Sequence, residues 1–122
     1  MYKLEDLEAW KKGRSFRQNI SNLCKKLPKE EKFRLVDQLI RASRSITANV
    51  AEGHGRFHYQ ENIQYCRQAR GSLIECLDHL YVALDEGYIN QEEMEKFRPS
   101  YDELLKILNG YIAYLQKAKK EK

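Results

Sequence analysis

The chain has little of what β-sheet, membrane-spanning or secreted proteins need. Two prolines and six glycines in 122 residues are few for an all-β fold, which needs a turn about every 8–12 residues. The longest run without a charged side chain is Ile107 to Gln116, about half the length of a membrane span. The first ten residues carry three acidic side chains and no apolar stretch, so we expect no secretory signal.

Cysteine is also scarce. Cys24, Cys66 and Cys76 form no C-x-x-C pair, which is typical of buried thiols in a reducing cytoplasm. Apolar residues are 42% and charged residues 33% of the chain, which is enough for a core and too apolar for a disordered chain. We therefore expect one cytoplasmic domain that spans residues 1–122.

Apolar residues recur at helical spacing in four stretches, and no stretch alternates long enough to predict a strand. Asn90 and Glu93 have the spacing of a capping box. Asp6 suits the N-cap of the first helix, and Gly87 suits the left-handed position after the third. Because the links are short, the pattern predicts an all-α, antiparallel up-down-up-down four-helix bundle. The expected helices cover about residues 7–27, 29–51, 59–86 and 90–117.

Two residues interrupt these patterns. Gly13 lies inside the first helix, where glycine costs about 1 kcal/mol relative to alanine, so we expect a neighbouring backbone to come close. Pro99 lies inside the fourth and predicts a kink or a separate short first segment, because proline has no N–H to donate.

Positive charge is concentrated early in the chain. Residues 1–72 hold 15 Lys/Arg and 8 Asp/Glu, giving +7, whereas residues 73–122 hold 7 and 10, giving −3. From Ala9 to Lys29 there are seven basic side chains and no acidic one. Such a surface favours a polyanionic partner, because each neutralised phosphate releases counterions. An ordinary solvated helix face is the alternative. The candidate phosphate contacts are Lys11, Arg14, Arg17, Lys25, Arg41, Arg44 and Arg56.

Two surfaces favour contacts between subunits. One face of the second helix combines arginine with small residues, a composition common in packed interfaces, although solvent exposure explains it equally well. The fourth helix is more apolar than one seam requires. The residues of these two surfaces are Arg34, Arg41, Ser45, Ala48 and Glu52, and Tyr111, Ile112, Tyr114 and Leu115.

Catalytic motifs are lacking. The chain has no P-loop, dinucleotide fingerprint or nucleophile elbow, and no Glu-x-x-His pair of the kind that builds a di-iron bundle. His54 and His58 lack zinc spacing, so we interpret them as solvated, with a metal site that includes a carboxylate as the alternative. The segment from Gly53 to Arg56 is interpreted as a turn, with a phosphate cradle as the alternative. We expect no catalytic residue, metal ligand or cofactor.

Three segments resemble a known bacterial family. They are Gln38 to Gly53 followed by Gly55 and Arg56, with its Ala-Asn-Val-Ala-Glu-Gly run, then Leu7 to Trp10, and Gly71 to Glu75. They are similar to four-helix-bundle proteins first found as reading frames inside intervening sequences of 23S ribosomal RNA genes. The resemblance spans about residues 5–116. It departs at Thr47, near which the family often has a proline.

The resemblance implies a cytoplasmic homopentamer with a central channel, a basic surface and no catalytic activity. A related family supplies pentameric accessory proteins to diversity-generating retroelements, which bind nucleic acid and a reverse transcriptase. The matched positions are interpreted as mainly structural, with Arg56 satisfying a carboxylate or the last carbonyls of the second helix and Gly71 and Ser72 permitting close packing. They are Arg41, Ser45, Asn49, Glu52, Gly53, Arg56, Gly71, Ser72 and Glu75.

Three hypotheses follow. The first is a non-enzymatic, oligomeric bundle that binds nucleic acid, RNA in particular, mostly without sequence preference. The second is an oligomeric adaptor whose partner is another protein, for example a reverse transcriptase. The third is a metalloenzyme built on His54, His58 and a carboxylate.

Overall fold

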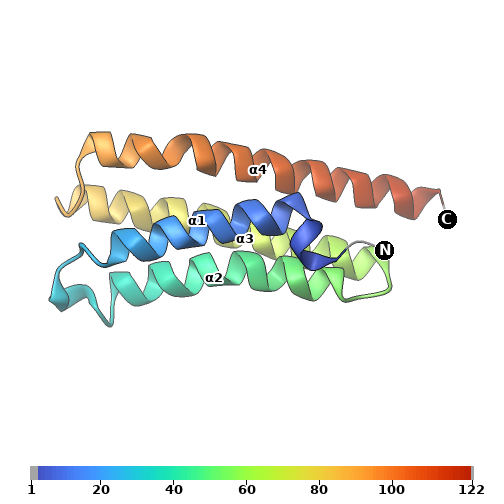
Figure 1. Ribbon diagram of the computed structural model, residues 1–122, viewed down its shortest axis with the longest axis horizontal. Helices are drawn as coiled ribbons and strands as arrows, with labels where there is room; N and C mark the ends of the chain where they lie inside the picture. Colours follow the sequence, from blue (N-terminus) through green and yellow to red (C-terminus); the bar gives the residue numbers. More distant parts are fainter. Residues whose placement is uncertain (1–2, 122) are drawn as a thin grey trace.

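The computed structural model describes residues 3–121, in which it contains four α-helices and no strand (Figure 1). This confirms the four predicted helices. The loop between the first two helices and the loop between the last two lie at one end of the molecule, and the remaining loop lies at the other end (Figure 1). The helices are α1 (Glu8–Cys24), α2 (Leu35–His54), α3 (Tyr59–Asp85) and α4 (Gln91–Lys120), with single 3-10 turns η1 (Leu4–Asp6) and η2 (Lys29–Glu31).

The largest boundary error concerns the first loop. We expected one helix to reach Leu27 and the next to begin at Lys29, but α1 ends at Cys24 and α2 begins at Leu35. Glu31 explains the late start, because its Oε1 accepts the backbone N–H of Leu35 at 3.2 Å and so satisfies a free donor of the first turn. The other oxygen of this carboxylate accepts the Tyr88 hydroxyl at 2.7 Å.

Two of the three cap predictions are confirmed. In the capping box of α4, Asn90 Oδ1 accepts the Glu93 N–H at 2.8 Å and Glu93 Oε1 accepts the Asn90 N–H at 3.1 Å. Gly87 takes a left-handed φ of 77° after α3. The prediction for Asp6 is wrong, because Asp6 belongs to η1 and Leu7 occupies the N-cap of α1 without a side-chain hydrogen bond.

Pro99 does not divide the fourth helix. α4 continues through it, so the separate first segment does not form. Met94 and Tyr101 on either side are buried in the core, and this packing holds the turn although proline removes one hydrogen bond. Ser100 Oγ donates to the Phe97 carbonyl at 3.1 Å within the same turn.

The core runs between the four helices, and Gly13 shows how closely α1 packs on α2. A Cβ at Gly13 would lie 3.1 Å from Thr47 Cγ2 and 3.4 Å from Ile46 Cγ2. The close neighbours are therefore side chains, and the expected approach of a backbone is wrong. The largest fully buried side chains include Phe16, Ile20, Leu39, Ile46, Leu73, Leu80, Leu104 and Leu108.

The three cysteines are buried, as predicted. Burial raises the pKa of the Cys24 and Cys66 thiols to about 11 and that of Cys76 to about 12. The thiols are therefore protonated at neutral pH, and protonated thiols are poor nucleophiles.

The apolar surface expected on the fourth helix is mostly internal. Ile112 and Leu115 are buried, and Tyr111 is partly buried against them. Only Tyr114 is exposed, at 60%, so this helix offers little of the surface from which we expected oligomerisation. Within residues 3–121, no helix has the length and apolar character needed to cross a membrane.

Candidate nucleic-acid interface

A groove of about 260 Å³ runs between α1 and α2, and we call it the basic groove. Arg17 and Arg44 approach it from opposite helices, so the fold brings together two of the predicted phosphate contacts. No acidic side chain lines it, and Ser43 Oγ is already engaged with the Ile40 carbonyl at 3.1 Å. Its lining residues are Arg17, Gln18, Ser21, Ile40, Ser43 and Arg44.

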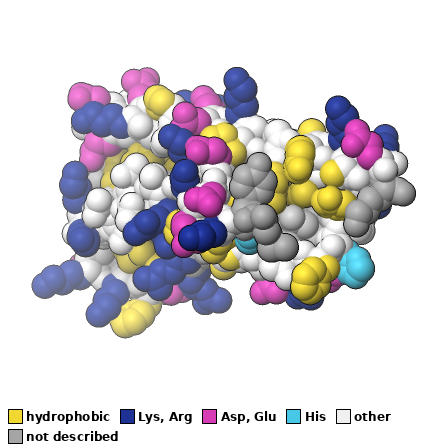
Figure 2. Space-filling model, turned by 45° about the vertical axis from the view of Figure 1, so that its right-hand side comes forward, with side chains coloured by type: hydrophobic (Ala, Val, Ile, Leu, Met, Phe, Trp, Pro, Cys, Tyr) yellow, Lys and Arg dark blue, Asp and Glu magenta, His cyan; other side chains and the backbone are white. Residues whose placement is uncertain are grey.

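Helical spacing extends this charge along α1. Residues three or four apart share a face, so Arg14 and Lys25 continue the line of Arg17 and Ser21. The Arg14 guanidinium lies 5.7 Å from the centroid of the Trp10 ring, a cation–π contact, and its carbonyl accepts Arg17 Nη1 at 3.4 Å. Figure 2 shows Lys and Arg side chains gathered at the lower left of that view, whereas Asp and Glu side chains lie mainly at the upper left and near the centre.

Besides Arg56, two of the candidates form ion pairs on the surface. Lys11 Nζ lies 3.6 Å from Glu8 Oε1, and Arg41 Nη1 lies 3.7 Å from Asp37 Oδ2, with the Arg41 side chain 80% exposed. Exposed pairs of this kind are worth about 0–1 kcal/mol, so a phosphate can compete for both cations. Arg44 and Lys25 make no ion pair within 4 Å among residues 3–121.

Arg56 is separate from this group and is held by acidic neighbours. It lies at the opposite end of α2 from η2, where Nη2 is 3.0 Å from Glu52 Oε2 and Nη1 is 3.3 Å from Glu61 Oε2. Nη2 also donates to the Tyr65 hydroxyl at 2.9 Å. Tyr65 and then the two carboxylates raise the pKa of Arg56 above its ordinary value. A phosphate at Arg56 would have to displace two carboxylates.

The Arg56 cluster follows the segment with the strongest resemblance to a known family, and Gly53 in that segment fixes the distance between α2 and α3. A Cβ at Gly53 would lie 2.6 Å from Asn62 Oδ1 and 3.0 Å from Tyr65 Cβ. Glycine is needed there because no larger side chain fits. Gly53 and Arg56, two of the matched positions, therefore form a structural junction between the two helices.

The sequence model of the family described as 23S rRNA-intervening sequence protein matches residues 5–110. The chain belongs to that family. A similar solved structure is that of a protein of unknown function from the S23 ribosomal protein family of Bacteroides thetaiotaomicron VPI-5482. It is 26% identical, the match covers 91% of this chain and 99% of that one, and the TM-score is 0.80. A comparison with curated proteins gives no match.

The other positions matched to the 23S rRNA-intervening sequence family also have mainly structural contacts. Ser45 Oγ accepts Asn49 Nδ2 and the Ser72 hydroxyl, each at 2.9 Å, so Ser45 points toward α3. Glu75 Oε2 lies 3.0 Å from His79 Nε2. The expected close packing at Gly71 is wrong, because a Cβ there would meet no atom within 4 Å.

The predicted turn follows α2, and the metal site considered as an alternative for His54 and His58 is not formed among residues 3–121. α2 continues through Gly53 to His54, and Gly55 has a φ of −76°, so the turn does not use the left-handed freedom of glycine. Among residues 3–121, no group of three or more His, Cys, Asp and Glu side chains could hold a metal ion. His54 and His58 are therefore not joined in such a group.

Sequence reasoning missed one apolar surface. Ile74, Tyr81 and Val82 on α3 are 48%, 45% and 39% exposed, and we call them the α3 apolar patch. The sequence did carry one signal: Ile74 and Tyr81 lie beside the line of apolar residues, such as Leu73 and Leu80, that forms the buried face of α3. Periodicity places such residues at a boundary, and only packing decides whether they are covered.

Proposed function

We propose that this chain is a non-enzymatic RNA-binding protein that contacts phosphates through the basic groove and the adjoining face of α1. The observation that carries the proposal is the pair Arg17 and Arg44, which face one groove with no acidic side chain in its lining. Backbone phosphates are the same in every sequence, so binding is mostly sequence-independent. The proposed contacts are Lys11, Arg14, Arg17, Lys25, Arg41 and Arg44.

The proposal includes an assembly. We infer an antiparallel up-down-up-down bundle that forms a cytoplasmic homopentamer, as the family resemblance implies. Five copies of a chain with net charge +4 would carry about +20, and a large positive field attracts polyanions and raises their association rate.

Binding is tested with labelled fragments of 23S ribosomal RNA over a salt series. The logarithm of affinity falls linearly with the logarithm of salt concentration, and each neutralised phosphate makes this slope steeper by about 0.7 on single strands. We expect affinity to fall steeply between roughly 50 and 200 mM salt. Absence of binding at the lowest salt would contradict the proposal. Light scattering with and without nuclease, read together with absorbance at 260 nm, measures the subunit number and bound nucleic acid.

A second candidate is an oligomeric adaptor for another protein, such as a reverse transcriptase. The α3 apolar patch supports it, because exposed apolar residues grouped on one face mark sites of protein contact. The test compares capture of a purified partner by the natural chain and by Ile74→Ser/Tyr81→Ser. Loss of capture with unchanged RNA affinity would favour the adaptor, and unchanged capture would oppose it.

A further inference from the structure

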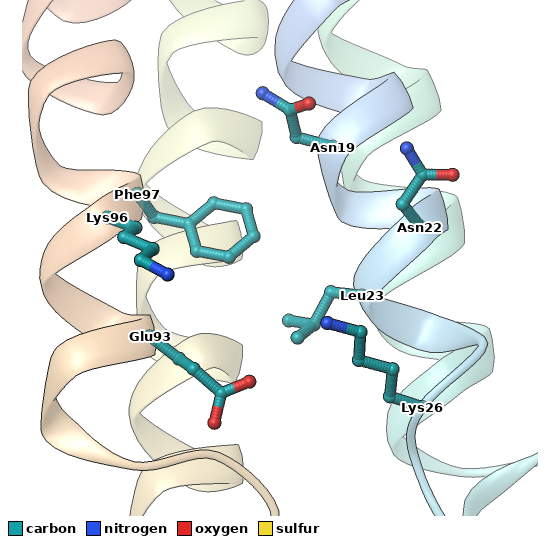
Figure 3. A pocket seen from close by; sticks show the side chains of 7 residues that line it. All are labelled: Asn19, Asn22, Leu23, Lys26, Glu93, Lys96 and Phe97. Carbon is teal, nitrogen blue, oxygen red and sulfur yellow. The ribbon is translucent and has the colours of Figure 1, made fainter.

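A second groove, of about 310 Å³, opens between α1 and α4 near the end of the molecule where the α3–α4 loop lies. Figure 3 shows polar side chains reaching into it from both helices and the Phe97 ring pointing from α4 toward α1. Its floor is Leu23 and Phe97, and its polar walls are Asn19, Asn22, Lys26, Glu93 and Lys96.

The Phe97 ring packs against a buried aromatic neighbour. It packs edge-to-face with the buried Phe16 ring, with centroids 6.4 Å apart and an interplanar angle of 78°. Phe97 itself is only partly buried, so part of its surface faces the groove. An accessible aromatic ring is a platform on which a flat heteroaromatic base stacks, and such stacking depends little on which base is present.

The polar groups around this ring match the rest of a nucleotide. Asn19 and Asn22 are exposed, and their amides both donate and accept, as base edges require. Lys26 makes no ion pair within 4 Å among the described residues, and Lys96 has only an exposed 3.9 Å contact with Glu92. The ammonium groups of Lys26 and Lys96 are therefore available to bind an anion in the groove.

Glu93 makes the site more selective than a simple basic patch. Its Oε1 is held by the backbone N–H of Asn90 at 3.1 Å, so the carboxylate is positioned rather than free to rotate. A carboxylate repels phosphate but accepts hydrogen bonds from the amino groups of bases. The groove thus has an acceptor for a base beside two cations for a phosphate.

We propose that the α1–α4 groove binds one nucleotide, with the base stacked on Phe97, its edge hydrogen-bonded by Asn19 and Asn22, and its phosphate held by Lys26 and Lys96. The volume is at the lower end for ligand pockets, about 300–1,000 Å³, which suits a single nucleotide. The nucleotide comes either free, as a nucleoside monophosphate, or as an unpaired residue of an RNA strand. This site is separate from the basic groove.

The test is an NMR titration of the full chain with AMP, GMP, CMP and UMP, with inorganic phosphate, and with a short single-stranded oligoribonucleotide. We expect the nucleotides to shift the side-chain amide signals of Asn19 and Asn22 and the ring signals of Phe97, whereas inorganic phosphate leaves the ring signals in place. Phe97→Leu keeps an apolar contact with Phe16 and should weaken nucleotide binding at least about fivefold, since stacking is worth roughly 1–3 kcal/mol per base.

Substitutions at the exposed residues of the groove do not depend on core packing, so they test the proposal even if Phe97→Leu fails to fold. Asn19→Ala/Asn22→Ala should reduce differences among the four bases, and Lys26→Ala/Lys96→Ala should weaken all four equally, whereas the matched change Gln64→Ala on α3 should alter neither. If the oligonucleotide shifts the same signals and binds more tightly than the monophosphates, the site belongs to an RNA strand. If it binds equally or more weakly, the site belongs to free nucleotides. Equal affinity of inorganic phosphate and AMP, or unchanged binding in these variants, would overturn the proposal.

This outcome is independent of the basic groove. Arg17→Ala/Arg44→Ala should weaken RNA binding while leaving the affinity for AMP unchanged. If RNA binding is absent but AMP still shifts the Phe97 ring, the proposed function fails and the nucleotide site stands. If RNA binds through the basic groove and no nucleotide shifts the Phe97 ring signals, the nucleotide site fails and the proposed function stands.

Discussion

Two arginine-bearing regions near α2 have opposite surroundings. In the basic groove, Arg17 and Arg44 face polar and apolar neighbours without a carboxylate. At the α2–α3 junction, Arg56 contacts Glu52, Glu61 and the Tyr65 hydroxyl. A basic residue is therefore a stronger candidate phosphate ligand where few carboxylates surround it than where two carboxylates and a hydroxyl hold it. The first region suits a ligand, and the second holds two helices together.

Gly53→Ala should have the largest effect on the free energy of unfolding, because it disturbs the packing at the α2–α3 junction. The new methyl group would lie 2.6 Å from Asn62 Oδ1, and overpacking of this severity destabilises by about 3 kcal/mol. The control is Gly71→Ala, where a Cβ meets nothing within 4 Å. That change should stabilise by about 0.5–1 kcal/mol, the helix-interior difference between glycine and alanine. Urea denaturation measures both, and equal effects would contradict the close approach at Gly53.

Arg17→Ala/Arg44→Ala should affect binding and leave stability nearly unchanged. Loss of two phosphate contacts should lower RNA affinity roughly tenfold at low salt and reduce the salt slope by about 1.4 on single strands. A matched loss of two exposed cations elsewhere, Arg67→Ala/Lys106→Ala, should change the slope less. Fluorescence anisotropy over a salt series measures both variants. Equal slopes would mean that RNA responds to net charge and not to the groove.

Arg56→Gln should give the reverse result. It removes both carboxylate contacts at the junction, so the thermal midpoint should fall while the salt slope of RNA binding stays at the natural value. Circular dichroism and anisotropy on the same sample measure the two quantities. A reduced salt slope with an unchanged midpoint would place Arg56 in the RNA interface and remove the distinction between the two regions.

The smallest effect is expected for Tyr88→Phe, at the end of the bundle where the α1–α2 loop lies. The hydrogen bond from Tyr88 to Glu31 lowers the pKa of Glu31 from 4.5 and raises that of Tyr88 from 10.0 to about 12. The Glu31 contribution to stability is present above pH 4.5 and decreases as pH falls through its lowered value. The Tyr88 contribution is present below pH 10 and is lost as pH rises through about 12.

The difference in stability between the natural chain and Tyr88→Phe should therefore be largest between about pH 5 and 10. It should vanish near pH 12 and shrink in acid, where the Leu35 N–H still binds Glu31 in both chains. Urea denaturation at a series of pH values measures it. A difference that does not vary with pH would show that the hydroxyl acts without Glu31.

Local sequence signals predicted much of the fold. The capping box at Asn90 and Glu93 and the left-handed Gly87 are confirmed, because each depends on residues within one turn. The predicted start of the second helix at Lys29 is wrong, since Glu31 caps Leu35 and also binds Tyr88, which is distant in sequence. The spacing of apolar residues along the second helix carries no information about that partner.

The candidate site was predictable only in part. The acid-free stretch from Ala9 to Lys29 indicated the basic face of α1, but not that Arg44 would share a groove with Arg17. The sequence also predicted Arg56 as a phosphate contact, but in the structure Arg56 is paired with Glu52 and Glu61. The groove between α1 and α4 gave no sequence signal, because it joins residues from opposite ends of the chain.

The amino-acid sequence predicts four amphipathic helices, two of their caps, the buried thiols and membership of the 23S rRNA-intervening sequence family. These properties depend on spacing and composition along a few turns. The tertiary structure alone decided which cations are neutralised, why Gly53 must lack a side chain, and that Phe97 faces a polar groove. The physical reason is that charge compensation and steric fit act between helices, over a few ångströms in space and tens of residues in sequence.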